Sequence, residues 1–275
     1  FFELIRKEVF SLDELQQAPT YFEEFKTANP SVIQSIGLKH INLKAESEKL
    51  KPQTSEDVAL TNVDEARARL ANVSFSHLHN HTQFTVLQST ATYKDIVKKA
   101  VEYNMPAVAL TDNGNMMGAF LFESEIASHN KKVKEKQKEA EENGESFAPN
   151  YIKPIIGCEF NVCKDLTNKS SQDNGYQAVL LAKNKKGYNN LIKLASIAYT
   201  EGYYYVPRID KTVIEKYKED IICLTGNLYG EVPNLILNVG EKPAEEALLW
   251  WKEQFQDDLY IEVMRHGQND ENRVN

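Results

Sequence analysis

The sequence predicts an α/β fold in which short apolar strands alternate with amphipathic helices. From residue 73 onward, brief runs of apolar residues recur, and most are followed by a segment with the apolar period of a helix. With 41% hydrophobic and 26% charged residues, the 275-residue chain has the composition of an ordinary soluble globular protein. Strands alternating with helices favour a parallel sheet with helices outside, either an α/β barrel or a doubly wound sheet.

Residues 1–72 differ in pattern from the rest, and we expect them to be the helical tail of an upstream domain followed by a linker. The apolar residues of the first ten positions fit one face of a helix. Residues 46–65 are polar and contain Pro52, which is typical of a connector. Because the chain opens without Met and stops without a closing element, we interpret it as a fragment of a longer protein.

The domain expected over residues 73–275 opens with a strand-like stretch at 73–81. Thr92 and Asp95 have the spacing of a capping box, which predicts the start of a helix. Further strands are expected at 107–110, 152–162, 177–182, 221–224 and 259–263. Further helices are expected at 116–128, 188–199, 213–217 and 244–255. The highly charged stretch 131–145 predicts a solvated helical extension or a mobile loop, and the alternative is a contact surface for a partner.

Charge and cysteine usage exclude several classes of protein. With 32 basic and 40 acidic residues the net charge is −8, so no global positive field exists to attract nucleic acid. No apolar run is long enough to span a membrane, and the first residues do not have the pattern of a signal peptide. Cys158, Cys163 and Cys223 lack CxxC spacing, which argues against disulfides and structural zinc and favours a cytoplasmic location.

The residues most suited to chemistry lie at the ends of predicted strands. His77, His79 and His81 alternate, so on a strand they would project to one side, where a pair of imidazoles can bind a metal ion. The alternative is a polar, solvent-facing strand. Asp112 and Glu159 each follow an apolar strand, the place where barrels collect functional residues. For Asp112, a helix cap remains an equal alternative.

The cluster Tyr203–Tyr205 with Arg208 allows two interpretations. Exposed aromatic rings beside a cation can stack on the bases of a nucleic acid. Aromatic residues in a loop between a helix and a strand more often cover the wall of a barrel, and we favour that interpretation.

Together these motifs resemble the polymerase-and-histidinol-phosphatase (PHP) domain, in the version that begins the alpha subunit of bacterial DNA polymerase III. The resemblance covers residues 73–275. It is carried, in chain order, by residues 75–91, 105–116, 154–159, 180–184, 230–233 and 265–275. The stretches 2–10 and 36–43 are similar to the segment that follows a fused proofreading exonuclease in some alpha subunits.

The resemblance implies a distorted barrel of seven strands with helices outside. Active members of the family hold up to three metal ions at the carboxyl ends of the strands and hydrolyse phosphoesters. His79 and His81 match the first pair of ligands and Glu159 matches the acidic ligand, with zinc or manganese as the metal. For the full-length polymerase the resemblance implies Mg²⁺, and as partners DNA, the remaining polymerase domains and a proofreading exonuclease module.

Four positions depart from the family's ligand pattern, and all four carry amides. Gln88 replaces Asp, Asn113 and Gln177 replace His, and Asn227 replaces Cys, while the last Asp-His motif would follow residue 275. Amides are poor ligands for zinc or manganese and bring no charge to offset several cations. We therefore expect no catalytic residue, no firmly bound metal and a structural scaffold. The alternatives are an active phosphoesterase or 3'-5' exonuclease of the PHP type, and an interaction module without enzymatic function.

Overall fold

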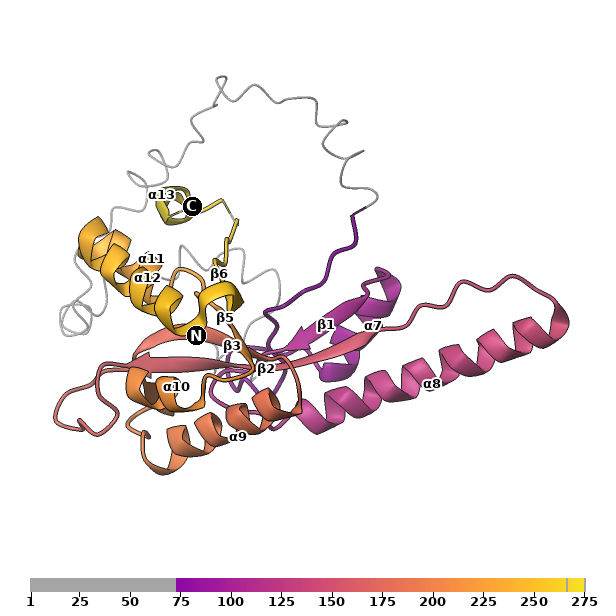
Figure 1. Ribbon diagram of the computed structural model, residues 1–275, viewed down its shortest axis with the longest axis horizontal. Helices are drawn as coiled ribbons and strands as arrows, with labels where there is room; N and C mark the ends of the chain where they lie inside the picture. The colour runs from indigo at the N-terminus through magenta and orange to yellow at the C-terminus, as the bar shows by residue number, and fades with distance from the viewer. Residues whose placement is uncertain (1–72, 266, 275) are drawn as a thin grey trace, which may run out of the picture. The chain divides into compact units, whose positions relative to one another are not determined.

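The computed structural model describes residues 73–265 and 267–274, which belong to one α/β unit (Figure 1). The helical tail and linker expected for residues 1–72 lie outside the described residues. The strands are β1 (Ala107–Leu110), β2 (Lys153–Cys163), β3 (Tyr176–Ala182), β4 (Arg208–Asp210), β5 (Ile221–Leu224) and β6 (Leu259–Tyr260). The helices are α7 (Tyr93–Glu102), α8 (Ala119–Asn143), α9 (Lys185–Thr200), α10 (Lys211–Tyr217), α11 (Glu231–Asn238), α12 (Glu241–Phe255) and α13 (Asn269–Val274).

The six strands form one mixed sheet, so the expected parallel pairing is found for three strand pairs and is wrong for the two that involve β3. Strand β2 pairs in parallel with β1 and β4, but β3 runs antiparallel to both β2 and β5. The reason is the connection between β2 and β3, which is the loop 164–175 with no crossover helix. A loop of that kind returns the chain antiparallel, whereas a parallel neighbour needs a longer crossover.

The seven-stranded barrel is not confirmed. Along the strand order β1-β2-β3-β5-β6, the described residues supply six strands, with β4 attached to β2, and the sheet does not close. Strands β1 and β6 are therefore the two ends of the sheet. The core supports the α/β class itself, because helices α9, α10 and α12 pack on one face of the sheet around Phe160, Leu180 and Trp251.

The stretch 73–81 is irregular, not the strand that its alternating pattern predicts. It nevertheless follows the free edge of β1. Ala109 N donates to His77 O at 2.9 Å, and Thr111 N donates to Asn80 O at 3.0 Å. Two such bonds hold the segment beside β1 without a continuous ladder.

The capping box predicted at Thr92 is confirmed at the start of α7. Asp95 N donates to Thr92 Oγ1 at 3.1 Å, and Thr92 N donates to Asp95 Oδ2 at 3.2 Å. Two backbone donors that the first turn of a helix leaves free are thereby satisfied. Val97 and Ala100, on the predicted apolar face, are buried.

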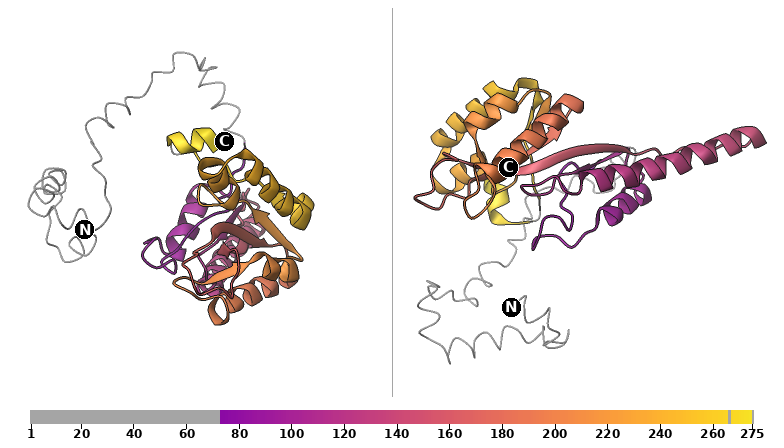
Figure 2. Two further views of the ribbon diagram at one scale, coloured as in Figure 1. Left: turned by 90° about the vertical axis from the view of Figure 1, so that its left-hand side faces the viewer. Right: turned by 90° about the horizontal axis from the view of Figure 1, so that it is seen from below.

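Helix α8 is much longer than the predicted segment 116–128, because it includes most of the charged stretch. It runs to Asn143 and extends away from the sheet, as Figure 1 and the right-hand view of Figure 2 show. Ile126, Val133 and Ala140 are its buried residues beyond the first turns, seven positions apart. The returning segment attaches to the helix through Tyr151, whose hydroxyl donates to Gln137 Oε1 at 2.9 Å. The charged stretch is thus a helical extension and not a loop as far as Asn143.

Arg208, at the start of β4, is fully buried and organises the loop between β2 and β3. Its guanidinium donates to the carbonyl oxygens of Asp173 at 2.8 Å, Asn168 at 3.3 Å and Leu166 at 3.4 Å. Its Nε donates to Gly202 O at 3.0 Å. A buried guanidinium carries five N–H donors and therefore needs several acceptors. Here four main-chain carbonyl oxygens accept from it. Arg208 is therefore a structural residue and is not available to a nucleic acid.

No helix among the described residues is long and apolar enough to cross a membrane.

Candidate metal centre

The structure brings three of the predicted site residues together. His79 and His81 lie on the segment beside β1, and Glu159 lies in β2, completely buried. One nitrogen of each histidine and one oxygen of Glu159 all lie within 4.8 Å of one another. The two imidazole rings meet edge to face, with their centroids 5.1 Å apart.

The backbone between the two histidines is fixed to β1 by reciprocal hydrogen bonds. Asn80 N donates to Thr111 Oγ1 at 2.9 Å, and the hydroxyl of Thr111 donates back to Asn80 O at 3.0 Å. The side chain of Asn80 donates to Ala109 O at 3.0 Å. These bonds take the place of regular strand pairing and keep His79 and His81 on the same side as Glu159.

Asp112 supports the turn that follows His81. Its Oδ1 accepts from Thr82 N at 2.6 Å and from the Thr85 hydroxyl at 2.7 Å, and its Oδ2 accepts from the Thr82 hydroxyl at 2.8 Å. The carboxylate is buried and surrounded by donors. It is neither a helix cap nor part of the His79, His81 and Glu159 group, because its oxygens are engaged by the turn.

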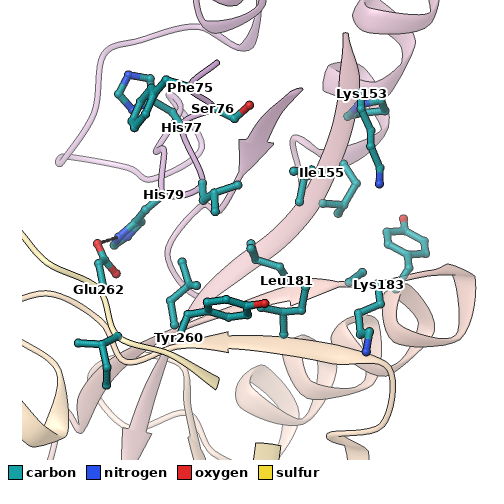
Figure 3. A pocket seen from close by; sticks show the side chains of 18 of the residues that line it. Phe75, Ser76, His77, His79, Lys153, Ile155, Leu181, Lys183, Tyr260 and Glu262 are labelled. Carbon is teal, nitrogen blue, oxygen red and sulfur yellow. Dashed lines mark hydrogen bonds and ion pairs between the residues drawn. The ribbon is translucent and has the colours of Figure 1, made fainter. Parts of the chain in front are cut away.

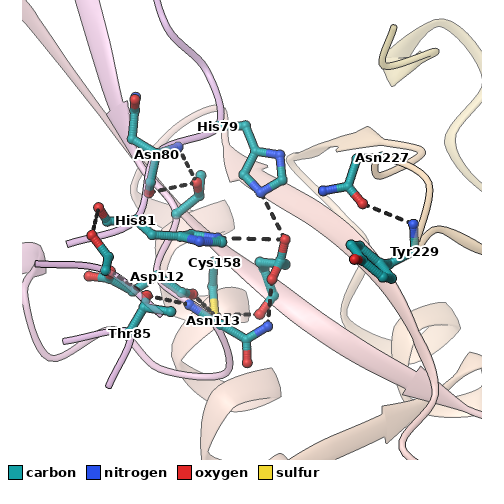
Figure 4. A network of polar contacts seen from close by, with 12 residues as sticks. His79, Asn80, His81, Thr85, Asp112, Asn113, Cys158, Asn227 and Tyr229 are labelled. Carbon is teal, nitrogen blue, oxygen red and sulfur yellow. Dashed lines mark hydrogen bonds and ion pairs between the residues drawn. The ribbon is translucent and has the colours of Figure 1, made fainter. Parts of the chain in front are cut away.

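Glu159 joins His79, His81 and Asn113, which are labelled in the polar network of Figure 4. His79 Nε2 lies 2.8 Å and His81 Nε2 lies 3.5 Å from Glu159 Oε2, while the side-chain amide of Asn113 donates to Glu159 Oε1. Burial alone would raise the pKa of Glu159, but the contacts from His79, His81 and Asn113 lower it to about 2. Glu159 is therefore a carboxylate at neutral pH.

His79 lies between two carboxylates. Its Nε2 faces Glu159, and its Nδ1 lies 2.7 Å from Glu262 Oε1, a contact visible in Figure 3. Burial would lower the pKa of His79, but the hydrogen bonds to Glu159 and Glu262 raise it to about 9.

His77 does not join the site, so the expectation that all three histidines project to one side is wrong. Its ring packs edge to face on Phe75, with the centroids 4.9 Å apart, and it lines the groove shown in Figure 3. The alternation rule applies to a regular strand, and the segment 73–81 is not one.

The four amides at ligand positions have four different environments. Asn113 contacts Glu159, whereas Asn227 Oδ1 accepts from Tyr229 N at 2.9 Å within its own turn. Gln88 is exposed. The Oε1 atom of Gln177 is buried and has no hydrogen-bond partner among the described residues. Only Asn113 has a hydrogen bond to the triad in this part of the chain.

The donor set of His79, His81 and Glu159 fits one metal ion. His81 Nε2 is buried, and its contact among the described residues is Glu159 Oε2 at 3.5 Å, a distance at the limit of a hydrogen bond that leaves the nitrogen free to bind a cation. Two imidazoles and one carboxylate are the set that zinc accepts while leaving one position open. The amide of Asn113, at another position of the family's ligand pattern, supplies neither a carboxylate nor an imidazole.

Glu262 is the residue that the sequence interpretation missed. It follows β6 directly after Ile261, so it is a carboxylate at the end of an apolar strand, the same signal that singled out Glu159. The signal was present, but β6 is short and the strand was expected to continue to Val263.

An α/β unit with a His-x-His segment and a glutamate converging at strand ends defines a domain of the PHP class. The family model of the PHP domain matches residues 77–266, and the chain belongs to this family. Its relatives include proteins named DNA polymerase III subunit alpha. That of Borreliella burgdorferi is 42% identical over 205 residues, which are 73% of this chain and 16% of the relative. That of Chlamydia trachomatis is 40% identical over 200 residues, 70% of this chain and 14% of the relative.

A third relative gives the same result. DNA polymerase III subunit alpha of Aquifex aeolicus is 37% identical over 203 residues, 70% of this chain and 16% of the relative. The matched region therefore spans only 14–16% of these three relatives' lengths. The resemblance to the PHP domain in its polymerase version is confirmed.

Proposed function

We propose that this chain is the PHP region of a replicative DNA polymerase III alpha subunit, whose full-length form carries out DNA-templated DNA synthesis. The support is the match over 70–73% of the chain to three relatives of that name. Polymerisation would take place in other domains, with Mg²⁺ as the metal. DNA, those domains and a proofreading exonuclease module would be the partners.

The PHP domain itself serves as a catalytically inactive scaffold. The observation that carries this proposal is the hydrogen bond from the Asn113 side chain to Glu159 Oε1. A neutral donor here occupies the carboxylate oxygen that a second cation would use, and no charge is added to offset that cation. A single zinc or manganese ion would be held weakly, by His79, His81 and Glu159. When bound, it would act as a Lewis acid on a coordinated water.

The domain organisation is part of the same proposal. Residues 73–275 would form most of the PHP domain, and the strands that complete the barrel would come from chain that follows residue 275. Residues 1–72 would connect this domain to an upstream exonuclease. The proposal agrees with the open ends of the described sheet at β1 and β6.

Metal content and hydrolysis, measured together, test the scaffold role. The chain is incubated with excess zinc or manganese, freed of unbound metal and analysed by mass spectrometry for metal per chain. Hydrolysis of bis-p-nitrophenyl phosphate and of 3'-labelled single-stranded DNA is measured in parallel. We expect at most about one ion per chain, as the three-ligand set allows, and no hydrolysis above the buffer rate.

Two or three ions per chain with chelator-sensitive hydrolysis would establish the alternative, an active phosphoesterase or exonuclease. The polymerase assignment is tested separately. Primer extension by the full-length protein should be template-dependent and require Mg²⁺, and its absence would refute the assignment.

A further inference from the structure

The contact between His79 and Glu262 spans the opening between the two ends of the sheet. His79 lies on the segment beside β1, the first strand of the sheet order, and Glu262 follows β6, the last. The contact lies at the edge of a groove of about 1400 Å³, whose lining includes Phe75, Tyr260 and both residues of the contact. Figure 3 shows the two side chains directed toward each other at this edge of the groove.

Both partners are held by the backbone around them. Glu262 N donates to Thr225 Oγ1 at 3.1 Å, and Thr225 N donates to Tyr260 O at 3.1 Å, so the segment after β6 is attached to the end of β5. On the other side, Asn80, which directly follows His79, is hydrogen-bonded to Ala109 of β1 and to Thr111. The 2.7 Å distance between His79 Nδ1 and Glu262 Oε1 therefore joins two segments that are each held by hydrogen bonds of their own.

The chemistry of this contact is that of a carboxylate orienting a metal-binding imidazole. A histidine that ligates a metal through one ring nitrogen usually donates its other N–H to a carboxylate or a carbonyl, which fixes its tautomer and the angle of its ring. Here Nδ1 of His79 faces Glu262 Oε1, and Nε2 faces Glu159 and the position shared with His81. Glu262 itself is outside the group of three ligands.

We propose that Glu262 is the positioning residue of this centre, holding the Nδ1–H of His79 so that Nε2 is directed at the cation site. The inference rests on the proposed binding of one ion by the triad. It also means that cation binding depends on the segment after β6 staying opposite β1. The two ends of the sheet are coupled through one side chain.

Three variants of the chain test this role. Glu262→Ala removes the acceptor, Glu262→Gln keeps an oxygen that can accept from Nδ1–H, and Glu253→Ala removes an exposed glutamate of α12 as a control. Zinc affinity is measured by competition with a chromophoric chelator. We expect Glu262→Ala to bind zinc about 10–100-fold more weakly than the unaltered chain. Glu262→Gln should recover most of that loss, and Glu253→Ala should show none.

A second readout does not depend on affinity. Nitrogen-15 spectra of the imidazole of His79 in the zinc-loaded chain should show a single Nδ1–H form in the unaltered chain and in Glu262→Gln. The Glu262→Ala variant should show altered shifts and exchange broadening. Its thermal unfolding should remain cooperative, because Glu262 is only partly buried.

The possible results separate the two proposals. Equal zinc affinity of Glu262→Ala and the unaltered chain would overturn the role of Glu262, and so would failure of the unaltered chain to bind zinc at millimolar concentration. The second result would leave the scaffold role intact. Hydrolysis with two or more bound ions would instead refute the scaffold role, while the ranking of the variants would still decide the role of Glu262.

Discussion

Asn113 and Glu159 are joined by their backbones as well as by their side chains. The two residues form a parallel bridge that continues the pairing of β1 with β2, and it is framed by Glu159 N donating to Asp112 O at 3.1 Å and Gly114 N donating to Glu159 O at 2.7 Å. The side chain at position 113 is therefore placed beside the Glu159 carboxylate by the sheet itself. Another residue type at this position would be presented to the same carboxylate.

Replacing Asn113 by His should restore a ligand. An imidazole in this position adds a nitrogen donor to a set of two histidines and one glutamate, so we expect zinc affinity to rise at least about tenfold. Chelator competition measures the change. Gln88→His is the matched control, because Gln88 is exposed and should give no gain. Equal affinities of Asn113→His and the unaltered chain would contradict this account of the site.

Asp112→Asn should destabilise the domain. All three neighbours of the carboxylate are donors, so an amide nitrogen in the place of one oxygen would face a donor and leave it unsatisfied. The expected loss is about 2–3 kcal/mol in the free energy of unfolding, measured by urea denaturation. Asp95→Asn, at an exposed cap, should cost less than about 1 kcal/mol. A loss at Asp112 no larger than that at Asp95 would show that the turn does not depend on two acceptor oxygens at this position.

Arg208→Lys should loosen the loop 164–175. Lysine carries three donors on one atom and cannot reach carbonyl oxygens on several sides, so at least two of these oxygens would stay buried without a partner. We expect a loss of about 2–4 kcal/mol in the free energy of unfolding. Limited proteolysis of the native variant should cut within the loop. Lys169→Ala, which removes an exposed cation of the same loop, is the control and should behave as the unaltered chain.

The thiol of Cys163 should react slowly below pH 10. Burial raises the pKa of Cys163 to about 11 and also raises that of Cys223. Since the folded chain holds the Cys163 proton more tightly, unfolding releases it above about pH 8.5, and this contribution to stability declines as the pH rises toward 11. Alkylation with iodoacetamide, followed by peptide mass spectrometry, should show little labelling of Cys163 at pH 8 and a rise beyond pH 10. Rapid labelling of the native chain at pH 8 would contradict the burial.

Local signals predicted much of the fold. The capping box at Thr92 and the apolar run of β1 act within a few residues, and both elements were found where the sequence indicated. The direction of β3 was missed, because the residues of a strand do not encode whether its neighbour runs parallel or antiparallel. Strand β4 was also missed, because it has three residues and one of them is Arg208, which is buried only through its carbonyl partners.

In the site, too, some residues could be predicted from the sequence and others depend on how the strands are arranged. His79, His81 and Glu159 were predicted together from a family resemblance, and the structure brings them together. His77 was assigned to the same face because a regular strand was assumed. Glu262 lies 183 residues from His79, and its partner is defined only when the sheet brings the segment after β6 across from β1. Contacts at that separation follow from topology, which the residues near Glu262 do not reveal.

The way Arg208 holds the loop 164–175 affects how this region can evolve. The guanidinium contacts carbonyl oxygens alone, which every amino acid provides, so exchanging the side chains at positions 166 and 168 leaves these acceptors in place. An insertion or deletion would move the oxygens away from their donors. Among homologous sequences, this loop should therefore vary freely in composition and little in length, with the arginine retained.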